Sequence, residues 1–340
     1  MKAMILAAGY GTRLRPLTYL SPKPVVPVCN RPLISYAVEA FLRSGIREIV
    51  VNLHHLPDQI EALLSDRYRG EADFRFSREP EILGTGGGVR KVRSTLEGDD
   101  HFFLVNADTI QFPRYESLKE ARRSIDGIAA LTLRHPPAGD RFTPVFLDQP
   151  FITGFGSGHG EALMFSGAHC ISRRVFDYLP DKPFSGIVDE VYQPLIDSGR
   201  ERLGAVVDDG LWFDIGTPAR YMAASRSLLE ATVQGAIEVA RGSRIAGDSV
   251  VSESARISGT VTGSSVGSGT VVEGAISDSV LWDDCHVAPG VTLNSCVVGA
   301  GVSLTRVASF QDMIICRDDP SVIPRDAGYA FADGLAMMSF

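Results

Sequence analysis

The chain has 340 residues, of which 44% are hydrophobic, so it is long enough for two domains with ordinary apolar cores. Its formal net charge of −8 argues against a nucleic-acid partner, because such a surface needs clustered Lys and Arg to neutralise phosphates. No apolar run approaches the ~18 residues that cross a bilayer, and the first glycine turn comes too early for a secretory signal, so we expect no membrane partner and a cytoplasmic location.

The cysteines are odd in number, widely spaced and without a CxxC pair. Such a pattern favours neither a disulfide framework nor a zinc site. We therefore expect reduced, mostly buried thiols at Cys29, Cys170, Cys285, Cys296 and Cys316.

The first expected strand, residues 4–8, is apolar and runs directly into a glycine-containing turn. Gly9 and Gly11 free the backbone to curl its N–H groups toward an anion, and Arg13 and Lys23 add positive charge. The spacing is neither GxGxxG nor GxxxxGK[ST], and a lone GxG is more often a plain turn. The pattern predicts a phosphate site, and the alternative is a glycine turn of a Rossmann-type strand with two surface cations.

The whole phrase AAGYGTRLRPLT followed by PKP resembles the opening signature of the nucleoside-diphosphate-sugar pyrophosphorylases, also called sugar-1-phosphate nucleotidyltransferases. The resemblance implies that Arg13 grips the β- and γ-phosphates and that Lys23 contacts the α-phosphate and the incoming sugar phosphate. Arginine suits the first role because its planar fork binds phosphate oxygens in pairs. Further nucleotide contacts are implied for Leu6, Ala7, Ala8, Gly9, Gly11 and Thr12.

Up to about residue 232, apolar strands alternate with amphipathic helical patterns. This alternation is typical of an α/β domain, here a Rossmann-like doubly wound mixed sheet, and we assign residues 1–232 to a nucleotidyltransferase catalytic domain. The expected strands cover 48–53, 74–77, 101–108, 128–134 and 165–172, and the expected helices cover 34–44, 57–64, 115–125 and 218–230. The strand at 101–108 is almost continuously apolar, which favours a central position.

Residues 237–316 contain aliphatic side chains spaced six residues apart. They are Ile245, Val251 and Ile257, then Val266 and Val272, Val287 and Leu293, and Val298 and Leu304. Hexapeptide spacing indicates a left-handed parallel β-helix, with a β-sandwich as the alternative. Phase breaks near 258–266 and 273–287 suggest loops, and residues 317–340 form a tail of unknown role without a usable period. Because such repeats expose flat faces and open ends, we expect a homo-oligomer formed through this region.

Two aspartates follow expected strands and are candidates for a magnesium site. Asp108 ends FFLVNAD, and Asp214 lies in LWFDIGTPARY, which resembles the family segment WxDxGTPxxY. Mg²⁺ prefers oxygen ligands and usually takes one or two carboxylates together with substrate phosphates. The alternative roles are an Asx turn for Asp108 and a strand-end cap for Asp214.

A second glycine-rich stretch, EPEILGTGGGVRK at 79–91, resembles the family loop that closes over the nucleotide base. By this resemblance Gly84 lets a backbone amide approach the base, and Thr85 and Asn106 contact the nucleotide. A carboxylate accepts paired hydrogen bonds from guanine N1–H and the 2-amino group, so Glu81 is our candidate for selecting GTP. Similar TGGG loops occur in uridylyl enzymes, which leaves the base open.

The sugar pocket departs from the family pattern. Many relatives carry an EKP phrase whose lysine binds the sugar phosphate, yet this chain has no lysine between Lys119 and Lys182. The strand at 165–172 stands where relatives read NAGIY, so Ser166 and Gly167 are the expected sugar contacts. His135, His159 and Arg141 are candidates to replace the lysine.

The expected activity is nucleotidyl transfer from GTP to mannose 1-phosphate, giving an NDP-sugar and pyrophosphate. Open alternatives are uridylyl or thymidylyl transfer to another sugar 1-phosphate, such as N-acetylmuramate or glucose 1-phosphate. Two further alternatives are acyl transfer through His286 and a non-catalytic regulatory subunit that senses nucleotide sugars. A subunit without activity is expected to have lost part of the set Arg13, Lys23, Asp108 and Asp214, and all four are present.

Overall fold

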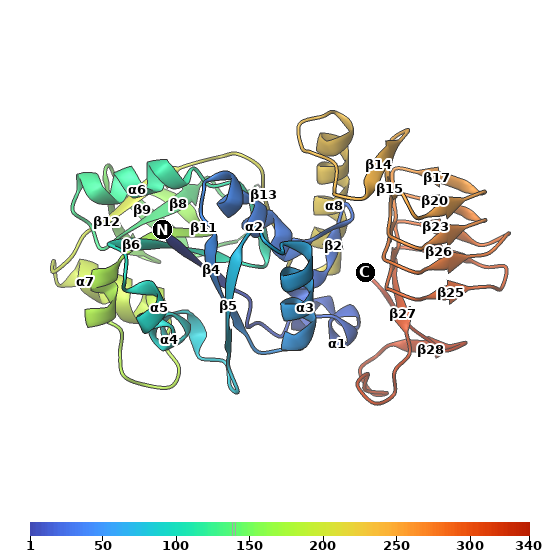
Figure 1. The fold of residues 1–340 in the computed structure, drawn as a ribbon, viewed down its shortest axis with the longest axis horizontal. Coiled ribbons are helices and arrows are strands. Elements are labelled where there is room, and N and C mark those ends of the chain that lie inside the picture. The colour runs from blue at the N-terminus through green and yellow to red at the C-terminus, as the bar shows by residue number, and fades with distance from the viewer. Residues whose placement is uncertain (138, 140) are drawn as a thin grey trace. The chain divides into compact units, whose positions relative to one another are not determined.

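The computed structural model of the protein describes residues 1–137, 139 and 141–340. The chain forms two compact units, each assembled from two segments. Unit 1 consists of Met1–Gly9 and Ile34–Trp212, and unit 2 consists of Tyr10–Leu33 and Phe213–Phe340 (Figure 1). The units divide the chain differently from the expected boundary at residues 232–237, which stays a prediction about domains.

Unit 1 is built on a mixed sheet of nine strands among the described residues. In spatial order these are β5 (Asp73–Arg78), β4 (Glu48–Leu53), β1 (Lys2–Leu6), β6 (His101–Asn106), β11 (Glu161–Ser172), β8 (Ala129–Arg134), β12 (Leu203–Val207), β10 (Phe151–Phe155) and β9 (Pro144–Asp148). Strands β5, β4, β1 and β6 are parallel, and β11 is antiparallel to both β6 and β8. The carboxyl ends of β1 and β6 therefore meet at one edge of the sheet, with Leu6 opposite Asn106.

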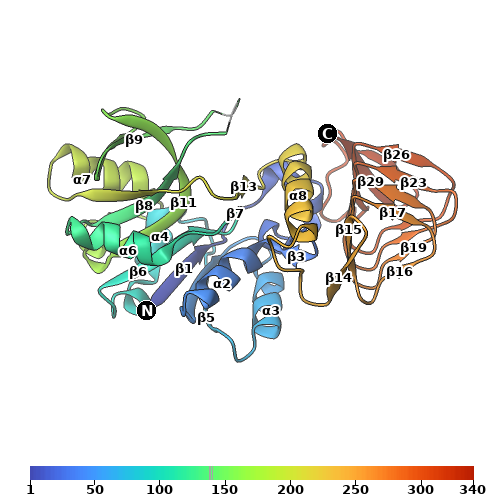
Figure 2. The same cartoon turned by 90° about the horizontal axis from the view of Figure 1, so that it is seen from above.

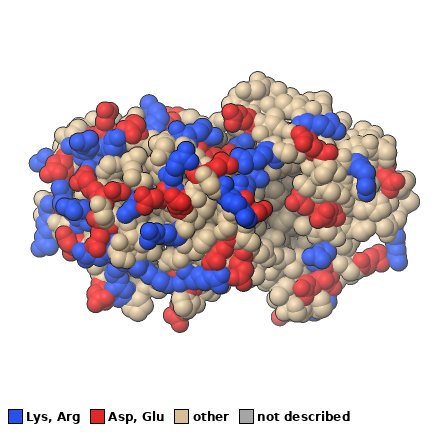
Figure 3. Space-filling model, in the orientation of Figure 1, with Lys and Arg blue, Asp and Glu red and all other residues tan. Residues whose placement is uncertain are grey.

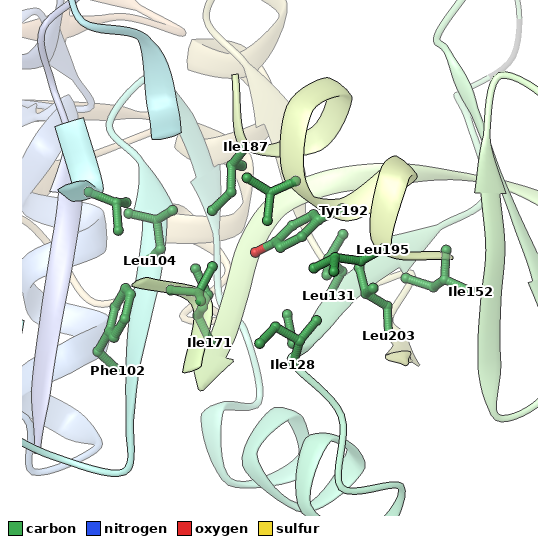
Figure 4. Close-up of a cluster of buried hydrophobic side chains, with 14 of the residues drawn as sticks. Phe102, Leu104, Ile128, Leu131, Ile152, Ile171, Ile187, Tyr192, Leu195 and Leu203 are labelled. Atoms are coloured by element: carbon green, nitrogen blue, oxygen red, sulfur yellow. The ribbon is translucent and has the colours of Figure 1, made fainter. Parts of the chain in front are cut away.

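Helices cover both faces of this sheet because successive side chains of its strands point to opposite sides. In β6, Phe102 and Leu104 join a large buried cluster with Tyr192 (Figure 4), whereas Phe103 lies against the Tyr115 ring on the other face. The helices of unit 1 are α2 (Leu33–Arg43, from the unit boundary), α3 (Pro57–Arg67), α4 (Gly84–Lys91), α5 (Arg93–Leu96), α6 (Tyr115–Ser124) and α7 (Gln193–Asp197).

The elements expected in unit 1 are confirmed, with small changes at their ends. The apolar run after residue 101 is an interior strand as predicted, but β6 ends at Asn106, so Asp108 lies in the turn before β7 (Thr109–Gln111). The glycine-rich stretch expected as a loop is helical from Gly84 onward.

Unit 2 contains a left-handed parallel β-helix whose coils stack on one another (Figure 2). One face holds β15 (Ser249–Ser252), β18 (Ser265–Val266), β21 (Val280–Leu281), β24 (Val297–Val298) and β27 (Met313–Arg317). The second holds β16 (Arg256–Ile257), β19 (Val271–Val272), β22 (His286–Val287) and β25 (Ser303–Leu304), and the third holds β17 (Thr260–Thr262), β20 (Ala275–Ser277), β23 (Thr292–Asn294) and β26 (Ser309–Gln311).

The predicted aliphatic ladder is confirmed except at its first position. Val251, Val266 and Val298 are buried in one cluster, but Ile245 is 41% exposed. Ile245 belongs to β14 (Ser243–Ala246), which pairs antiparallel with β15 and so ends the stack as a hairpin instead of adding a coil.

The expected loops at the phase breaks are corners of regular coils. Val250 pairs with Ser265, fifteen residues later, and Val280 pairs with Val297, seventeen residues later. These coils are shorter than three full hexapeptides, so the six-residue period must break at the corners. A Cβ on the corner residue Gly259 would lie 1.9 Å from the carbonyl oxygen of Gly274 in the next coil.

The terminal tail closes the other end of the β-helix. Strand β29 (Leu335–Ser339) pairs antiparallel with β27 and with β28 (Ala330–Ala332). Helix α8 (Pro218–Val233), the short helix α1 (Leu17–Leu20) and the hairpin of β2 (Pro27–Val28) and β3 (Arg31–Pro32) complete unit 2, together with β13 (Trp212–Asp214) at its boundary.

Side-chain contacts join the segment Tyr10–Leu33 to the rest of unit 2. The Asn30 amide donates to the Val266 carbonyl at 2.7 Å. The Tyr221 hydroxyl of α8 donates to the Pro27 carbonyl and accepts a hydrogen bond from the Trp282 indole at 3.1 Å. The glycine-turn segment is therefore fixed by the same body that contains the repeats.

No helix in the described part of the chain is both long and apolar enough to cross a membrane. Lys and Arg are interspersed with Asp and Glu on the face shown in Figure 3. All five cysteines are buried and free of disulfides, as expected from their spacing.

Candidate active site

The glycine turn of unit 2 is held in a conformation that requires glycine. Gly11 has φ of 63°, and a Cβ there would lie 3.0 Å from the Cβ of Lys23. The Thr18 hydroxyl donates to the Gly11 carbonyl at 2.8 Å, which fixes the turn. Thr12 and Arg13 follow in a single exposed 3-10 turn, Thr12–Leu14, so their polar groups remain available to a ligand.

Asp214 lies among cations at the end of β13. Its Oδ1 is 4.0 Å from Lys23 Nζ, and its Oδ2 accepts a hydrogen bond from Arg220 at 2.5 Å. A Cβ on Gly216 would lie 2.7 Å from Asp214 Oδ2 and 2.9 Å from a guanidinium nitrogen of Arg13, so Gly216 lets these two groups approach. One carboxylate among three cations leaves positive charge at this place, as phosphate binding requires.

In unit 1, a buried hydrogen-bond network follows the ends of β1 and β4. Asn52 Oδ1 accepts from the backbone N–H of Ala7 at 2.8 Å, and Asn52 Nδ2 donates to Glu79 Oε1 at 2.9 Å. Glu79 Oε2 in turn accepts from the Leu83 N–H at 3.0 Å. Asn52 and Glu79 are each only 3% exposed, so this network fixes the residues after β1 relative to the start of α4.

The glycine-rich segment packs tightly on the residue pair Ser185–Gly186. A Cβ on Gly84 would lie 2.5 Å from the Ser185 carbonyl oxygen, and the Gly86 N–H donates to that same oxygen at 2.8 Å. Gly84 and Thr85 are half-buried at the start of α4, whereas Glu81 is exposed just before it. The role of Glu81 in selecting the base stays a prediction.

The predicted sugar contacts lie beside the predicted nucleotide contact at the end of β6. Gly167 has φ of 103°, and a Cβ there would lie 2.9 Å from Asn106 Nδ2. The Ser166 hydroxyl is buried, 3.0 Å from Gln111 Oε1 and 3.0 Å from the Thr132 carbonyl. Asp108 is half-buried in the turn that follows Asn106.

The three residues suggested as replacements for the missing lysine lie on the surface of unit 1. His135 is bonded to Asp209 at 2.7 Å and to Glu161 at 3.0 Å, and these two carboxylates raise its pKa. The side chain of His159 is 76% exposed, and Arg141 is exposed as well. None of the three is drawn into a buried polar site.

Each unit therefore carries part of the predicted constellation. Unit 2 brings together Gly11, Thr12, Arg13, Lys23 and Asp214. Unit 1 holds Leu6, Ala7, Ala8, Gly9, Glu81, Gly84, Thr85, Asn106, Asp108, Ser166 and Gly167.

Sequence reasoning missed Asn52, Glu79, Gly216 and Arg220. A signal existed for two of them, because Gly216 and Arg220 lie in the same LWFDIGTPARY phrase as Asp214. Asn52 has a weaker sign, as a polar residue in the apolar strand expected over 48–53, and Glu79, which follows the strand expected over 74–77 in a polar stretch, has none.

The donor set is compatible with magnesium bound together with a nucleotide. No group of three His, Cys, Asp or Glu side chains suited to a metal ion occurs among the described residues. Asp214 in unit 2 and Asp108 in unit 1 each supply hard carboxylate oxygens, and one such carboxylate with substrate phosphates is enough to hold Mg²⁺. The cations around Asp214 suit the phosphates that such a complex would carry.

Comparison with known proteins identifies the family of the chain. The nucleotidyl transferase family model matches residues 2–138, and the model for a GlmU-like C-terminal hexapeptide region matches residues 230–327. Mannose-1-phosphate guanyltransferase of Eremothecium gossypii is 31% identical over 270 residues, covering 76% of this chain and 73% of that protein. Mannose-1-phosphate guanylyltransferase 1 of Arabidopsis thaliana is 29% identical over 326 residues, 93% of this chain and 86% of that one.

A solved structure shares the fold. HddC from Yersinia pseudotuberculosis, crystallised in complex with GMP-PN, superposes with a TM-score of 0.57 at 21% identity, covering 67% of this chain and 99% of that one. Fold and site together define a nucleotidyl transferase joined to a hexapeptide-repeat β-helix. The chain belongs to the sugar-1-phosphate nucleotidyltransferase family, in the branch that includes the mannose-1-phosphate guanylyltransferases.

Proposed function

We propose that this nucleotidyltransferase moves the guanylyl group of GTP to mannose 1-phosphate, giving GDP-mannose and pyrophosphate. The observation that carries the proposal is the position of Asp214 among Arg13, Lys23 and Arg220, because one carboxylate with three cations suits a nucleoside triphosphate. The choice of guanine and mannose rests on the names of the relatives, which do not favour the uridylyl or thymidylyl alternative.

In the proposed reaction, a phosphate oxygen of the sugar 1-phosphate attacks the α-phosphorus of GTP. The new P–O bond forms as the bond to the β-phosphate oxygen breaks, and pyrophosphate leaves with its electron pair. Catalysis of such transfer consists mainly of positioning and charge neutralisation. Arg13 is assigned to the departing phosphates, and Lys23 to the α-phosphate and the sugar phosphate, where a compact ammonium suits the reacting centre.

Magnesium is part of the proposal, with Asp108 and Asp214 as its protein ligands. When bound, the ion would neutralise charge on the triphosphate and on the leaving pyrophosphate. Arg13 and Lys23 act on the same charge from the protein side, and the Gly11 turn orients them.

For base selection, we assign the approach to the base edge to the Gly84 backbone and the selection of guanine to Glu81. The support is that Gly84 is only half-buried at the start of α4 and that Glu81 is exposed just before it. Guanine offers N1–H and an amino group to one carboxylate, a pair that uracil lacks.

Assembly and location complete the proposal. We assign a homo-oligomer to unit 2, supported by the flat faces that its stacked coils present. A cytoplasmic location is supported by five buried free thiols, since disulfides are rare in reducing compartments.

The test is a pyrophosphate-release screen that crosses GTP, UTP, dTTP, ATP and CTP with several sugar 1-phosphates in the presence of Mg²⁺. We expect the highest kcat/KM for GTP with mannose 1-phosphate. A clear preference for UTP or dTTP would overturn the base assignment, and release with no pair would favour the regulatory-subunit alternative. Removal of Mg²⁺ with EDTA is expected to abolish release, and unchanged release would refute the metal assignment.

A further inference from the structure

The tail at residues 317–340 is firmly joined to the last coil of the β-helix. Its strand β29 pairs with β27 over five residue pairs and also pairs with β28. The Asp318 N–H donates to the Gly334 carbonyl at 2.8 Å, and the Asp318 carboxylate lies 2.9 Å from the Arg325 guanidinium. The tail is therefore a fixed part of unit 2, and its side chains have defined positions.

A row of five side chains runs from this tail to the glycine-turn segment of the same unit. In order along this aromatic row they are Arg325, Phe331, Tyr329, Tyr19 and Arg15. The Tyr329 ring meets both Phe331 and Tyr19 edge to face, each with ring centres 6.4 Å apart. The guanidinium carbon of Arg325 lies 4.3 Å from the Phe331 ring centre, and that of Arg15 lies 4.5 Å from the Tyr19 ring centre. Edge-to-face ring pairs and guanidinium groups over rings are both attractive arrangements.

The tail turns its aromatic side toward helix α1. Tyr329 and Phe331 are two residues apart in an extended segment, so their side chains lie on the same side of it. Both are half-buried, whereas Ala330 and Ala332 are exposed. Burial, together with the neighbouring Tyr19 phenol, raises the pKa of Tyr329, so this ring enters the row as a neutral phenol.

Helix α1 connects the aromatic row to the turn that carries Arg13. Thr18 precedes the tyrosine that α1 contributes to the row, and its hydroxyl donates to the Gly11 carbonyl at 2.8 Å. The Arg15 N–H donates to the Thr12 carbonyl at 3.3 Å. Arg13 therefore lies between residues that are bonded to one another, and the members of the row adjoin these bonds on the α1 side.

We propose that the tail is a positioning element of the active site, in which Tyr329 holds α1 through Tyr19 and α1 fixes the turn that presents Arg13 to the triphosphate. The inference rests on the proposed function, which assigns Arg13 to the departing phosphates, and it gives a role to a tail without a sequence motif. Tyr329 is a positioning residue, because it acts through α1. Its loss should weaken the interaction with the triphosphate and leave the sugar 1-phosphate unaffected.

The first test is Tyr329→Ala, which removes the ring that joins the tail to α1. We expect the KM for GTP to rise about ten-fold, the scale of one lost aromatic pair, with the KM for mannose 1-phosphate unchanged. Tyr329→Phe keeps the ring and should restore the KM for GTP. Phe340→Ala, which removes an exposed aromatic residue at the end of the same tail, should behave as the wild type. A wild-type KM for GTP in Tyr329→Ala would overturn the inference.

The second test combines Tyr329→Ala with Arg13→Met and determines whether the tail acts through Arg13. Once Arg13 is absent there is no guanidinium to misplace, so Tyr329→Ala should no longer change the KM for GTP. The double variant should therefore have the same KM for GTP as Arg13→Met alone. A further ten-fold rise in the double variant would mean that Tyr329 affects the nucleotide by another route, and it would overturn the positioning of Arg13.

Hydrogen exchange of the full chain without substrates separates this inference from the proposed function. The N–H groups of Leu14, Tyr19 and Ser21 donate within the segment at 3.0, 3.1 and 3.1 Å, so their exchange rates report how firmly the turn and α1 are held. Peptides covering residues 10–21 should exchange about five-fold faster in Tyr329→Ala than in the wild type or Tyr329→Phe, whereas peptides of α3 should be unchanged.

Faster exchange in a protein that gives no turnover with any nucleotide would support the positioning of the turn and place the failure in the proposed function. Unchanged exchange in Tyr329→Ala, with turnover of GTP by the wild type, would overturn the role of the tail and leave the proposed function intact.

Discussion

The polar groups of the two units differ in character. In unit 2, Asp214 lies among Arg13, Lys23 and Arg220, and positive charge exceeds negative charge. In unit 1, the groups near the ends of β1 and β4 are bonded to one another, as Asn52 is to Glu79 at 2.9 Å. The difference indicates that the polar cluster of unit 2 has uncompensated positive charge, whereas the polar network of unit 1 consists of paired hydrogen bonds.

The largest effect is expected in unit 2. Asp214→Asn keeps the shape of the side chain but removes the charge, so kcat should fall about 1,000-fold, a loss typical of removing an electrostatic contact to a transition state. The unfolding midpoint should fall as well, because the carboxylate no longer offsets the repulsion among Arg13, Lys23 and Arg220. Steady-state kinetics and thermal unfolding measure the two quantities.

Asp66→Asn is the matched control, since Asp66 is exposed and pairs only with Arg69 at 3.3 Å among the described contacts. Near-normal turnover by Asp214→Asn would show that this cluster is not catalytic. The proposed division between the units would then fail.

Gly216→Ala tests how closely charge must be placed in unit 2. The added methyl group would lie 2.7 Å from Asp214 Oδ2 and 2.9 Å from Arg13, so both groups must move apart. We expect kcat/KM to fall about 30-fold, since small displacements of positioned groups have large kinetic effects. Gly98→Ala is the control because its methyl group would meet only the flexible end of Lys2 at 3.1 Å. Equal losses in both variants would contradict the need for close placement.

Glu79→Gln tests the unit 1 side of the comparison. Glu79 accepts hydrogen bonds at both oxygens, from Asn52 at 2.9 Å and from the Leu83 N–H at 3.0 Å. A glutamine replaces one acceptor with a donor, so we expect the free energy of unfolding to fall by about 2 kcal/mol, measured by urea denaturation. In contrast with Asp214→Asn, this variant should lose stability and keep most of its kcat. A large fall in kcat with an unchanged free energy of unfolding would contradict the structural role of Glu79.

The sequence predicts local elements well and long-range pairings poorly. The strand–turn pattern before Gly11 and the phrase around Asp214 are local signals that span a few residues, so Lys23 and Asp214 can be predicted as site residues from the sequence alone. The bond from Asn52 to Glu79 joins residues 27 positions apart, and its only local sign is a polar residue in an apolar run. A small pocket of unit 1 lined by Thr132, Ser166 and Trp212 has no local sign, because three separate strands bring these residues together.

The β-helix shows the same limit. The six-residue period identifies the aliphatic ladder of the β-helix. Ile245 has the right spacing, yet it lies outside the buried core of the β-helix and is 41% exposed. A strand adds a coil only if the residues after it turn the corners and pair in parallel with the neighbouring coil, and six-residue spacing does not report on that pairing. A hairpin at the end of the stack therefore cannot be distinguished from a further coil by spacing alone.

The smallest expected effect concerns a histidine in the core of unit 1. His169 is 1% exposed on β11, with its Nδ1 3.0 Å from the Tyr192 hydroxyl, and burial lowers its pKa to about 3. Below pH 6.5 the unfolded chain takes up a proton on this residue that the folded chain takes up only near pH 3, so stability falls as the pH falls. From pH 7.5 to pH 5.5 the loss should be about 1.4 kcal/mol.

Urea denaturation at the two pH values measures this loss, and His169→Gln provides the comparison. The variant lacks the titrating group, so its stability should change about 1.4 kcal/mol less than that of the wild type over the same interval. Groups elsewhere in the chain titrate equally in both proteins and cancel in the difference. Equal pH dependence in the wild type and in His169→Gln would mean that His169 takes up its proton in the folded protein as readily as in the unfolded chain. The core of unit 1 would then hold a positive charge at pH 5.5, contrary to the difference between the units described above.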